Sequence, residues 1–144
     1  MLTTNQKGAI AETAIAHEAM KLGIGVYRPY GDERTDLIFD LRPRLVRVQC
    51  KWASRYDDII VVRLYAARRT ANGLRRTFYT SDEIDAFAAY CVETDRCYFF
   101  EIADLKARAT VQLRLKATRN NQESGIRWSR DYEFGATLTS LMGP

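Results

Sequence analysis

Apolar side chains near the N-terminus recur at the spacing of a helix. Between positions 5 and 22 they are Ala9, Ile10, Ala14, Ile15 and Met20, in a stretch rich in alanine. Spacings of three and four residues place such side chains on one face of a helix. The pattern therefore predicts a helix over residues 5–22, with Asn5 as its cap and Gly23 as its stop.

The pattern changes to that of strands after Gly23. Strands are predicted over residues 24–28, 37–39 and 45–52, and the turn at 42–44 predicts that the last two pair antiparallel. The segment 45–52 alternates strictly, so its two faces differ in character. Val46, Val48, Cys50 and Trp52 belong to one face, and Arg47, Gln49 and Lys51 belong to the other.

Further strands are predicted on both sides of an Asn72-Gly73 turn. Asn-Gly is a strong hairpin signal, so the segments 59–67 and 74–79 are expected to pair. Residues 97–102 form a short apolar run that predicts a central strand, and residues 111–115 predict an edge strand.

A second helix is predicted after Thr80. Thr80 and Glu83 match the capping-box pattern. The apolar face of this helix would carry Ile84, Phe87, Ala88 and Cys91. A loop is expected over 120–125. The resulting order (helix, three or more strands, helix, strand) predicts an α/β fold with a mixed sheet flanked by helices.

Length and composition are typical of one globular domain. The chain has 144 residues, of which 47% are hydrophobic and 28% charged. No apolar run approaches the roughly 18 residues that a membrane-spanning helix needs, and the first residues lack the pattern of a secretion signal. No linker or repeat divides the sequence. We therefore expect a single domain over residues 1–144, located in the cytoplasm and without a membrane partner.

The distribution of charge favours nucleic acid as a partner. The net charge is +4, and 17 of the 22 basic residues are arginine, whose planar fork suits phosphate and base edges. Residues 42–76 hold ten Lys or Arg against two acids, whereas residues 77–105 hold seven acids against one Arg. Residues 106–130 are basic again. Two basic segments around an acidic one are consistent with a one-sided patch that binds a phosphate backbone.

Cysteine and histidine content excludes several kinds of site. Cys50, Cys91 and Cys97 are odd in number and lack paired CxxC spacing, so neither a disulfide framework nor a zinc site is expected. His17 is the single histidine, which argues against a multi-histidine metal site.

Four polar residues from distant parts of the chain are predicted to meet. With an odd register between the paired strands, Asp36 shares a face with Gln49 and Lys51. The first helix can place Glu12 at the same end of the sheet. Two acids, an amide oxygen and an ammonium group would then face one cleft. Phosphodiester hydrolysis uses such a set, because oxygen ligands hold Mg²⁺ and an ammonium group stabilises the charge that develops.

This arrangement resembles the PD-(D/E)XK nuclease superfamily. The likeness is carried by Arg34-Thr35-Asp36, then Val48-Gln49-Cys50-Lys51, with Glu12 in an upstream helix. Within the superfamily the chain is most similar to bacterial group I intron homing endonucleases and related small nucleases, in which glutamine can replace the second acid. Archaeal-type Holliday-junction resolvases are the next likeness. The resemblance covers about residues 5–105 and implies a restriction-endonuclease-like core of order α-β-β-β-α-β.

The resemblance also implies roles for the four residues. Asp36 would be the main metal-binding acid, helped by the backbone carbonyl of Cys50. Lys51 would be the catalytic lysine, and Glu12 the acid that orders the metal or its water. Mg²⁺ is the implied cofactor, with Mn²⁺ as a substitute. Gln49 replaces an acid, which lowers the negative charge of the site by one and predicts weaker metal binding. Thr35 stands where the motif has proline, a position that carries no chemistry.

Seven arginines are expected to contact DNA. They lie in the first basic segment, and four of them flank the Asn72-Gly73 turn. The set is Arg42, Arg44, Arg47, Arg68, Arg69, Arg75 and Arg76.

The function predicted from these features is metal-dependent, site-specific cleavage of double-stranded DNA, and the resemblance implies that the product carries a 5′-phosphate. A homodimer or higher homo-oligomer is expected, because cutting both strands needs two clefts. Two alternatives stay open on the sequence: a Holliday-junction resolvase, and a non-catalytic DNA-binding module with a decayed nuclease core. RNA as the substrate is also compatible with the sequence.

Overall fold

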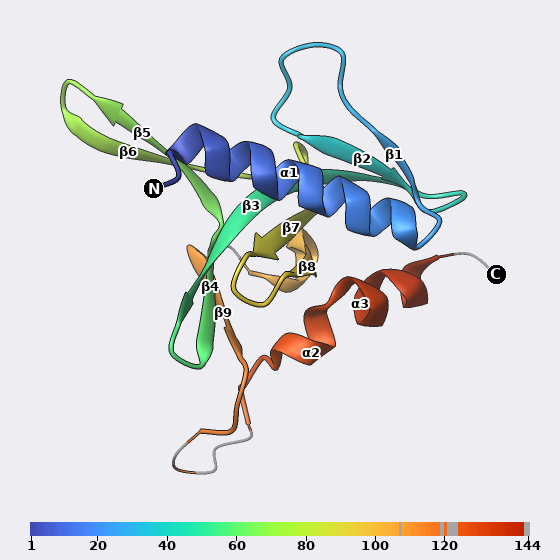
Figure 1. The fold of residues 1–144 in the computed structure, drawn as a ribbon. Helices are drawn as coiled ribbons and strands as arrows, with labels where there is room; N and C mark the ends of the chain where they lie inside the picture. The colour runs from blue at the N-terminus through green and yellow to red at the C-terminus, as the bar shows by residue number, and fades with distance from the viewer. Residues whose placement is uncertain (107, 119, 121–123, 143–144) are drawn as a thin grey trace.

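The computed structural model describes residues 1–106, 108–118, 120 and 124–142. Their helices and strands follow one another along the chain as Figure 1 shows. The elements are α1 (Thr4–Lys21), β1 (Gly25–Tyr27), β2 (Leu37–Asp40), β3 (Leu45–Tyr56), β4 (Ile59–Arg63), β5 (Tyr65–Thr70), β6 (Gly73–Phe78), β7 (Ala86–Cys91), β8 (Arg96–Glu101), the 3₁₀ turn η1 (Ile102–Asp104), β9 (Thr110–Arg114), α2 (Ser129–Tyr132) and α3 (Phe134–Leu141).

The first helix forms where the apolar periodicity predicted it. Its cap is Thr3 rather than Asn5: the Thr3 hydroxyl accepts from the backbone N–H of Gln6 at 3.1 Å, and the Gln6 side chain accepts from the Thr3 N–H at 2.8 Å. This reciprocal pair satisfies two N–H groups at the helix end, which a single cap at Asn5 would not do. The predicted stop is confirmed, because Gly23 follows the helix with a positive φ of 84°.

The long strand β3 organises the sheet. Its first residues pair antiparallel with β2, its middle pairs in parallel with β7, and its last residues pair antiparallel with β4. β1 extends the sheet beyond β2, β9 extends it beyond β4, and β8 pairs with β7. The mixed sheet is therefore confirmed, and β9 is the edge strand that the sequence predicted.

Two hydrophobic clusters cover the two faces of this sheet. α1 lies across one face, where Ile15 packs with Phe39 and Val48. The second cluster lies on the other face and includes Ile60 and Phe100. The apolar face predicted for β3 is confirmed, since Val46, Val48, Cys50 and Trp52 all belong to the cluster beneath α1.

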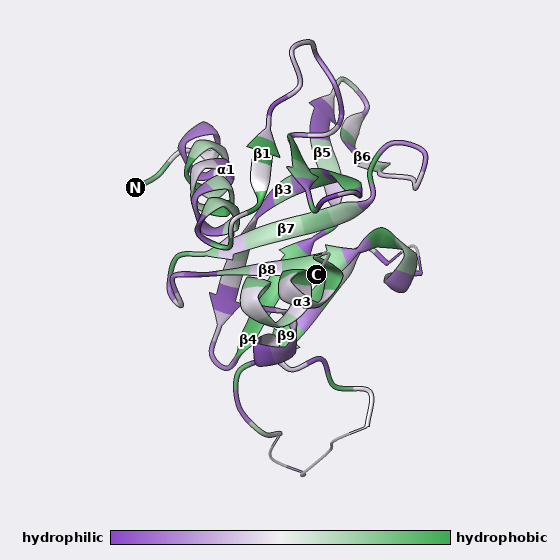
Figure 2. Ribbon diagram, turned by 90° about the vertical axis from the view of Figure 1, so that its right-hand side faces the viewer, coloured by the Kyte–Doolittle hydropathy of each residue, from purple (hydrophilic) through white to green (hydrophobic). Residues whose placement is uncertain are grey.

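The helix predicted after Thr80 is wrong. Glu83 accepts from the Thr80 backbone N–H, which is one half of a capping box. The Thr80 hydroxyl donates to the Glu83 carboxylate instead of accepting from the Glu83 N–H, and the chain makes only one turn before it enters β7. All residues from Ala86 to Cys91 are buried, and β7 lies between β3 and β8. The strand is hydrophobic along its length (Figure 2). A helix here would expose half of these side chains to water, so burial on both faces favours the strand.

Two other predicted strands differ in detail. The segment 59–67 is not one strand, because the chain leaves the sheet at Leu64 and divides into β4 and β5. β5 and β6 pair across the Asn-Gly turn as predicted, but they form a separate hairpin that projects from the body (Figure 1). β8 is not central: it pairs only with β7, and its other side meets the α2–α3 segment through a bridge between Tyr98 and Glu133. Most of the predicted loop at 120–125 lies outside the described residues.

No helix in the described ranges is long and apolar enough to cross a membrane.

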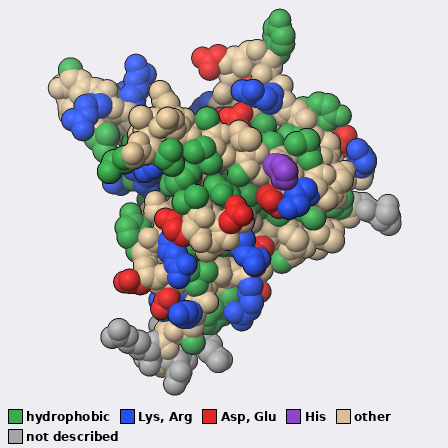
Figure 3. Space-filling view, in the orientation of Figure 1, with side chains coloured by type: hydrophobic (Ala, Val, Ile, Leu, Met, Phe, Trp, Pro, Cys, Tyr) green, Lys and Arg blue, Asp and Glu red, His purple; other side chains and the backbone are tan. Residues whose placement is uncertain are grey.

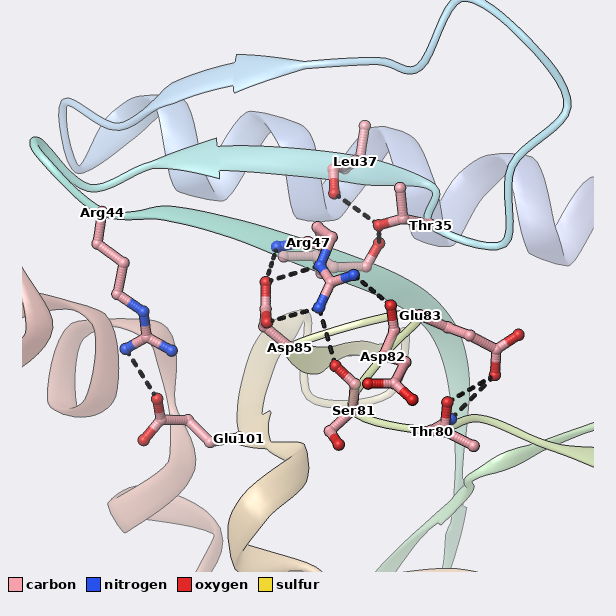
Figure 4. A network of polar contacts seen from close by, with 11 residues as sticks. Thr35, Leu37, Arg44, Arg47, Thr80, Ser81, Asp82, Glu83, Asp85 and Glu101 are labelled. Carbon is pink, nitrogen blue, oxygen red and sulfur yellow. Dashed lines mark hydrogen bonds and ion pairs between the residues drawn. The ribbon is translucent and has the colours of Figure 1, made fainter.

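The turn before β7 is held by one arginine (Figure 4). Asp85 accepts from the Arg47 backbone N–H at 2.8 Å, from its Nε at 3.1 Å and from its Nη2 at 3.0 Å. The same guanidinium donates to the backbone carbonyls of Ser81 and Asp82. These bonds lower the pKa of Asp85 below its usual value. The interaction ties β3 to the chain that enters β7, the strand with which β3 pairs in parallel.

We predict that Asp85→Asn lowers the free energy of unfolding by about 1–2 kcal/mol, because it weakens three hydrogen bonds to a charged, partly exposed partner. Urea denaturation near pH 7 measures the loss. Because the folded-state pKa of Asp85 is lowered, its contribution is complete well above the unfolded value of about 4 and is lost as pH falls through the folded pKa. The difference between the two proteins should therefore shrink in acid.

Glu101→Gln is the matched control, since it weakens a single exposed ion pair with Arg44 at 3.1 Å. Its expected cost is about 0.5 kcal/mol or less. An equal loss for the two variants would mean that the Arg47–Asp85 contact has no special structural role.

Candidate functional site

An open edge of β3 forms the centre of the candidate site. β2 pairs with β3 only as far as Val48, and β4 joins β3 only from Ser54 onward. Between these points β3 pairs only with β7 among the described strands. The backbone on the other edge of β3 is therefore available to side chains.

Asp36 occupies this edge. Its backbone N–H donates to the Val48 carbonyl at 2.9 Å, and its Oδ2 accepts from the Cys50 N–H at 2.9 Å. The carboxylate thus takes the place of the next residue of β2 in the hydrogen-bonded ladder. The pairing of Leu37 with Val48 has the odd register that the predicted site requires, and it ends there, because the Asp36 N–H donates to Val48 and not to Gln49.

Lys51 extends toward the start of the projecting hairpin. Its Nζ donates to the Tyr65 carbonyl at 3.0 Å and lies 5.0 Å from the centre of the Tyr79 ring. Burial and the charges of Arg63 and Arg34 lower the pKa of Lys51 to about 8, although the charge of Asp36 opposes the shift. The ammonium group is therefore held by the protein and lies within electrostatic reach of the Asp36 carboxylate.

Glu12 approaches the same edge from α1. It pairs with Arg28, whose Nε lies 3.3 Å from its Oε1. Burial and then the charge of Glu12 raise the pKa of Asp36, against the Cys50 hydrogen bond and the charges of Lys51 and Arg28. Asp36 therefore lies between an acid on the helix side of the sheet and a lysine on the other side, and the fold brings these groups to one edge.

Gln49 supplies an unusual polar atom. Its Oε1 is buried and accepts no hydrogen bond from the described part of the chain. A buried carbonyl without a donor costs free energy, so such atoms in native proteins call for an explanation. An amide oxygen beside a carboxylate is a suitable ligand for a hard divalent cation.

These residues could hold a divalent cation through amide and backbone oxygens as well as carboxylates. No group of three His, Cys, Asp or Glu side chains able to hold a metal occurs in the described ranges. A cation at this edge would need amide or backbone oxygens beside the carboxylates. The Cys50 carbonyl meets this need, because the N–H and C=O of one strand residue point to the same edge, and the Cys50 N–H already meets Asp36. The Cys50 thiol itself belongs to the core, and burial raises its pKa well above the usual value.

The arginines predicted to contact DNA occupy two kinds of environment. Arg68, Arg69, Arg75 and Arg76 are exposed on the β5–β6 hairpin, whose outer end is covered by basic side chains in Figure 3. Arg42 is exposed at the turn between β2 and β3. Arg44 and Arg47 are paired with Glu101 and Asp85 (Figure 4).

Sequence reasoning missed several residues around Lys51. Tyr65 holds the ammonium group through its backbone carbonyl, which no side-chain pattern can reveal. Tyr79 packs edge-to-face on Phe87 and presents its ring to two cations. Arg34 stands two positions before Asp36, and that proximity was the one available signal for it.

Comparison with known proteins identifies the family and the fold. The profile of the PD-(D/E)XK endonucleases matches residues 2–135, and the chain belongs to this family. Its members are endonucleases, which hydrolyse phosphodiester bonds, and they typically use a divalent metal.

A solved structure shares the fold over nearly the whole chain. The structure of a bacterial homing endonuclease, I-Ssp6803I, superposes with a TM-score of 0.77 and 27% sequence identity, covering 96% of this chain and 93% of that one. A search of curated proteins gives no significant match. The family resemblance seen in the sequence and the predicted fold class are both confirmed.

The unpaired Gln49 oxygen predicts a gain in stability on its removal. In metal-free buffer we expect Gln49→Leu to raise the free energy of unfolding by about 1 kcal/mol, because an apolar side chain of similar size avoids the cost of an unsatisfied carbonyl. Urea denaturation in EDTA measures the change.

Thr35→Val provides the control on a neighbouring polar residue. The Thr35 hydroxyl lies 3.2 Å from the carbonyls of both Leu37 and Val48 (Figure 4 shows these contacts), so its removal should cost about 1 kcal/mol. If Gln49→Leu destabilises the protein as much as Thr35→Val does, the Gln49 oxygen has a partner and the argument for a ligand role is lost.

Proposed function

We propose that this protein is a metal-dependent endonuclease that cuts double-stranded DNA at specific sites. The observation that carries the proposal is the Asp36 carboxylate on the open edge of β3, with the Lys51 ammonium group held nearby at the Tyr65 carbonyl. The buried, unpaired Oε1 of Gln49, two residues before Lys51 on β3, supports it. Glu12 acts on the same carboxylate from α1. Membership of an endonuclease family supports hydrolysis as the reaction.

Four groups would hold the cation. They are the carboxylates of Asp36 and Glu12, the amide oxygen of Gln49 and the backbone carbonyl of Cys50. All are hard oxygen donors, as Mg²⁺ prefers, and Mn²⁺ would substitute for it. A cation bound there would polarise the phosphoryl group and acidify a water molecule. Because Gln49 is neutral, the site carries one negative charge fewer than a site with a second acid, which leaves Glu12 a larger share of the binding.

Lys51 would act directly on the reacting phosphate. Its ammonium group is fixed at the Tyr65 carbonyl and faces the Asp36 edge, so it can donate hydrogen bonds to the attacking water or to a phosphate oxygen. Preorganised positive charge is effective there because negative charge develops on the phosphoryl oxygens during hydrolysis. Tyr65 would be the residue that keeps this charge in position.

The β5–β6 hairpin would bind the DNA beside the cleft. Its four exposed arginines are free of the carboxylate pairs that engage Arg44 and Arg47. The hairpin starts at Tyr65, whose carbonyl accepts a hydrogen bond from Lys51. The hairpin that binds DNA would therefore contact the catalytic lysine directly. A two-stranded ribbon fits the major groove, where base pairs are distinguishable. Arg42, Arg44 and Arg47 would add contacts from the β2–β3 hairpin.

Two copies of the chain would act on one duplex. One cleft cuts one strand, and the strands run in opposite directions, so a symmetric homodimer or higher homo-oligomer would place a second cleft on the other strand. The product would carry a 5′-phosphate. The similarity to a bacterial homing endonuclease supports site-specific duplex cleavage over junction resolution.

We predict that Lys51→Ala lowers the rate of DNA cleavage at least a hundredfold while duplex binding changes less than threefold, because the ammonium group acts on the reacting phosphate and the hairpin supplies most of the affinity. Cleavage of supercoiled plasmid in Mg²⁺ or Mn²⁺ gives the rate, and EDTA should stop the reaction. Lys21→Ala is the matched control, because Lys21 pairs with Glu18 at the far end of α1.

Cleavage assays on plasmid and on four-way-junction DNA distinguish the alternative functions. Nicking or cutting at one plasmid site supports the homing-type reaction, whereas selective cutting of a four-way junction would replace it with resolution. Binding without cutting by either wild-type protein or Lys51→Ala would show a non-catalytic DNA-binding module and would overturn the proposal.

A further inference from the structure

Arg34 lies beside the candidate site but belongs to none of the groups assigned above. Its Nη1 donates to the Phe78 carbonyl at 3.0 Å and to the two Glu83 carboxylate oxygens at 3.0 and 2.9 Å. Its Cζ lies 3.9 Å from the centre of the Tyr79 ring. The guanidinium is therefore stacked on an aromatic face and fixed at one of its three nitrogen atoms.

The N–H groups on Nε and Nη2 of Arg34 take no part in these bonds. An arginine carries five N–H groups, and the bonds to Phe78 and Glu83 all leave from Nη1. About 32% of the side chain is exposed. Arg34 also lines a surface hollow, so a ligand has room to reach it. The other lining residues include Thr35, Ile38 and Arg47 and the carboxylates Glu33, Asp82 and Glu83.

The Tyr79 ring places Arg34 beside Lys51. The ring lies 3.9 Å from Arg34 Cζ and 5.0 Å from Lys51 Nζ, and it is itself held edge-to-face by Phe87 at 5.5 Å. Two cations gathered on one ring repel each other; Glu83 pairs with Arg34, and Asp36 attracts Lys51 without a direct ion pair among the described contacts. An anion bound between the two would relieve this repulsion, and the planar fork of arginine fits phosphate oxygens.

We propose that Arg34 binds a non-bridging oxygen of a DNA backbone phosphate beside Lys51, with Tyr79 and Glu83 as the positioning residues that hold its guanidinium flat. The inference rests on the proposed function for its substrate, and it adds a phosphate-binding residue to the cleft. A purely structural role would instead make Arg34 a tie between β6 and the turn before β7.

The salt dependence of duplex binding separates these two roles. Each phosphate contact contributes about 0.9 to the slope of log affinity against log salt concentration for B-DNA. Arg34→Gln keeps a long side chain that can still donate to Glu83 but loses the charge. We expect it to weaken binding about tenfold and to reduce the slope by about 0.9. Arg34→Lys should retain the slope, because it retains the charge.

Two further variants complete the experiment. Glu83→Ala loosens the guanidinium but keeps its charge beside the phosphate, so the phosphate role predicts weaker binding at an unchanged slope. Arg69→Ala on the hairpin supplies a reference for the loss of one exposed arginine. Binding is measured by fluorescence anisotropy with a labelled duplex in EDTA, and thermal unfolding of each variant checks that it is folded.

The proposal is overturned when Arg34→Gln leaves the slope unchanged, or when Glu83→Ala reduces it equally. This readout does not depend on cleavage. A wild-type protein that cuts no DNA would refute the proposed function, while the slope would still decide whether Arg34 meets a phosphate.

Discussion

The site depends on one hydrogen bond that replaces a strand pairing. Where β2 stops and β3 continues, the Asp36 carboxylate accepts the Cys50 N–H that a further residue of β2 would otherwise have taken. This bond fixes the carboxylate against the edge of β3, with Gln49 and Lys51 on one side and α1 on the other. A longer β2 would close the edge with backbone, and a shorter one would leave the carboxylate without its N–H donor. The position at which the pairing ends therefore decides whether a cation could reach the strand.

The rest of the fold offsets the free-energy cost of the polar groups at this edge. The cluster beneath α1 and the cluster on the opposite face bury both sides of β3 and β7, which offsets the cost of a partly buried acid, a lysine held away from bulk water and an amide oxygen without a donor. Several unfavourable polar groups placed close together in this way are typical of functional sites. The Arg47–Asp85 contact keeps the turn before β7 in place. Glu83 belongs to this turn and pairs with Arg34.

The sequence predicted the elements whose side-chain pattern had one interpretation. Strict alternation over 45–52 gave the faces of β3, whereas the odd register was a condition of the predicted site that the pairing of Leu37 with Val48 meets. The second helix failed because Thr80 and Glu83 satisfy a local capping pattern, whereas burial of residues 86–91 on both faces is a property of the assembled sheet. Tyr65, Tyr79 and Arg34 were out of reach for a similar reason: their roles come from a backbone carbonyl, a ring face and a tertiary contact.

Direct titration with Mn²⁺ tests the central claim that the edge of β3 is a cation site. Isothermal calorimetry without DNA, on wild-type protein, Asp36→Asn and Gln49→Glu, reports the affinity without any cleavage step. The account predicts one site per chain in the wild-type protein, loss of that site in Asp36→Asn, and roughly tenfold tighter binding in Gln49→Glu, because a carboxylate there adds a charged oxygen ligand. Equal Mn²⁺ affinity in all three proteins would contradict it.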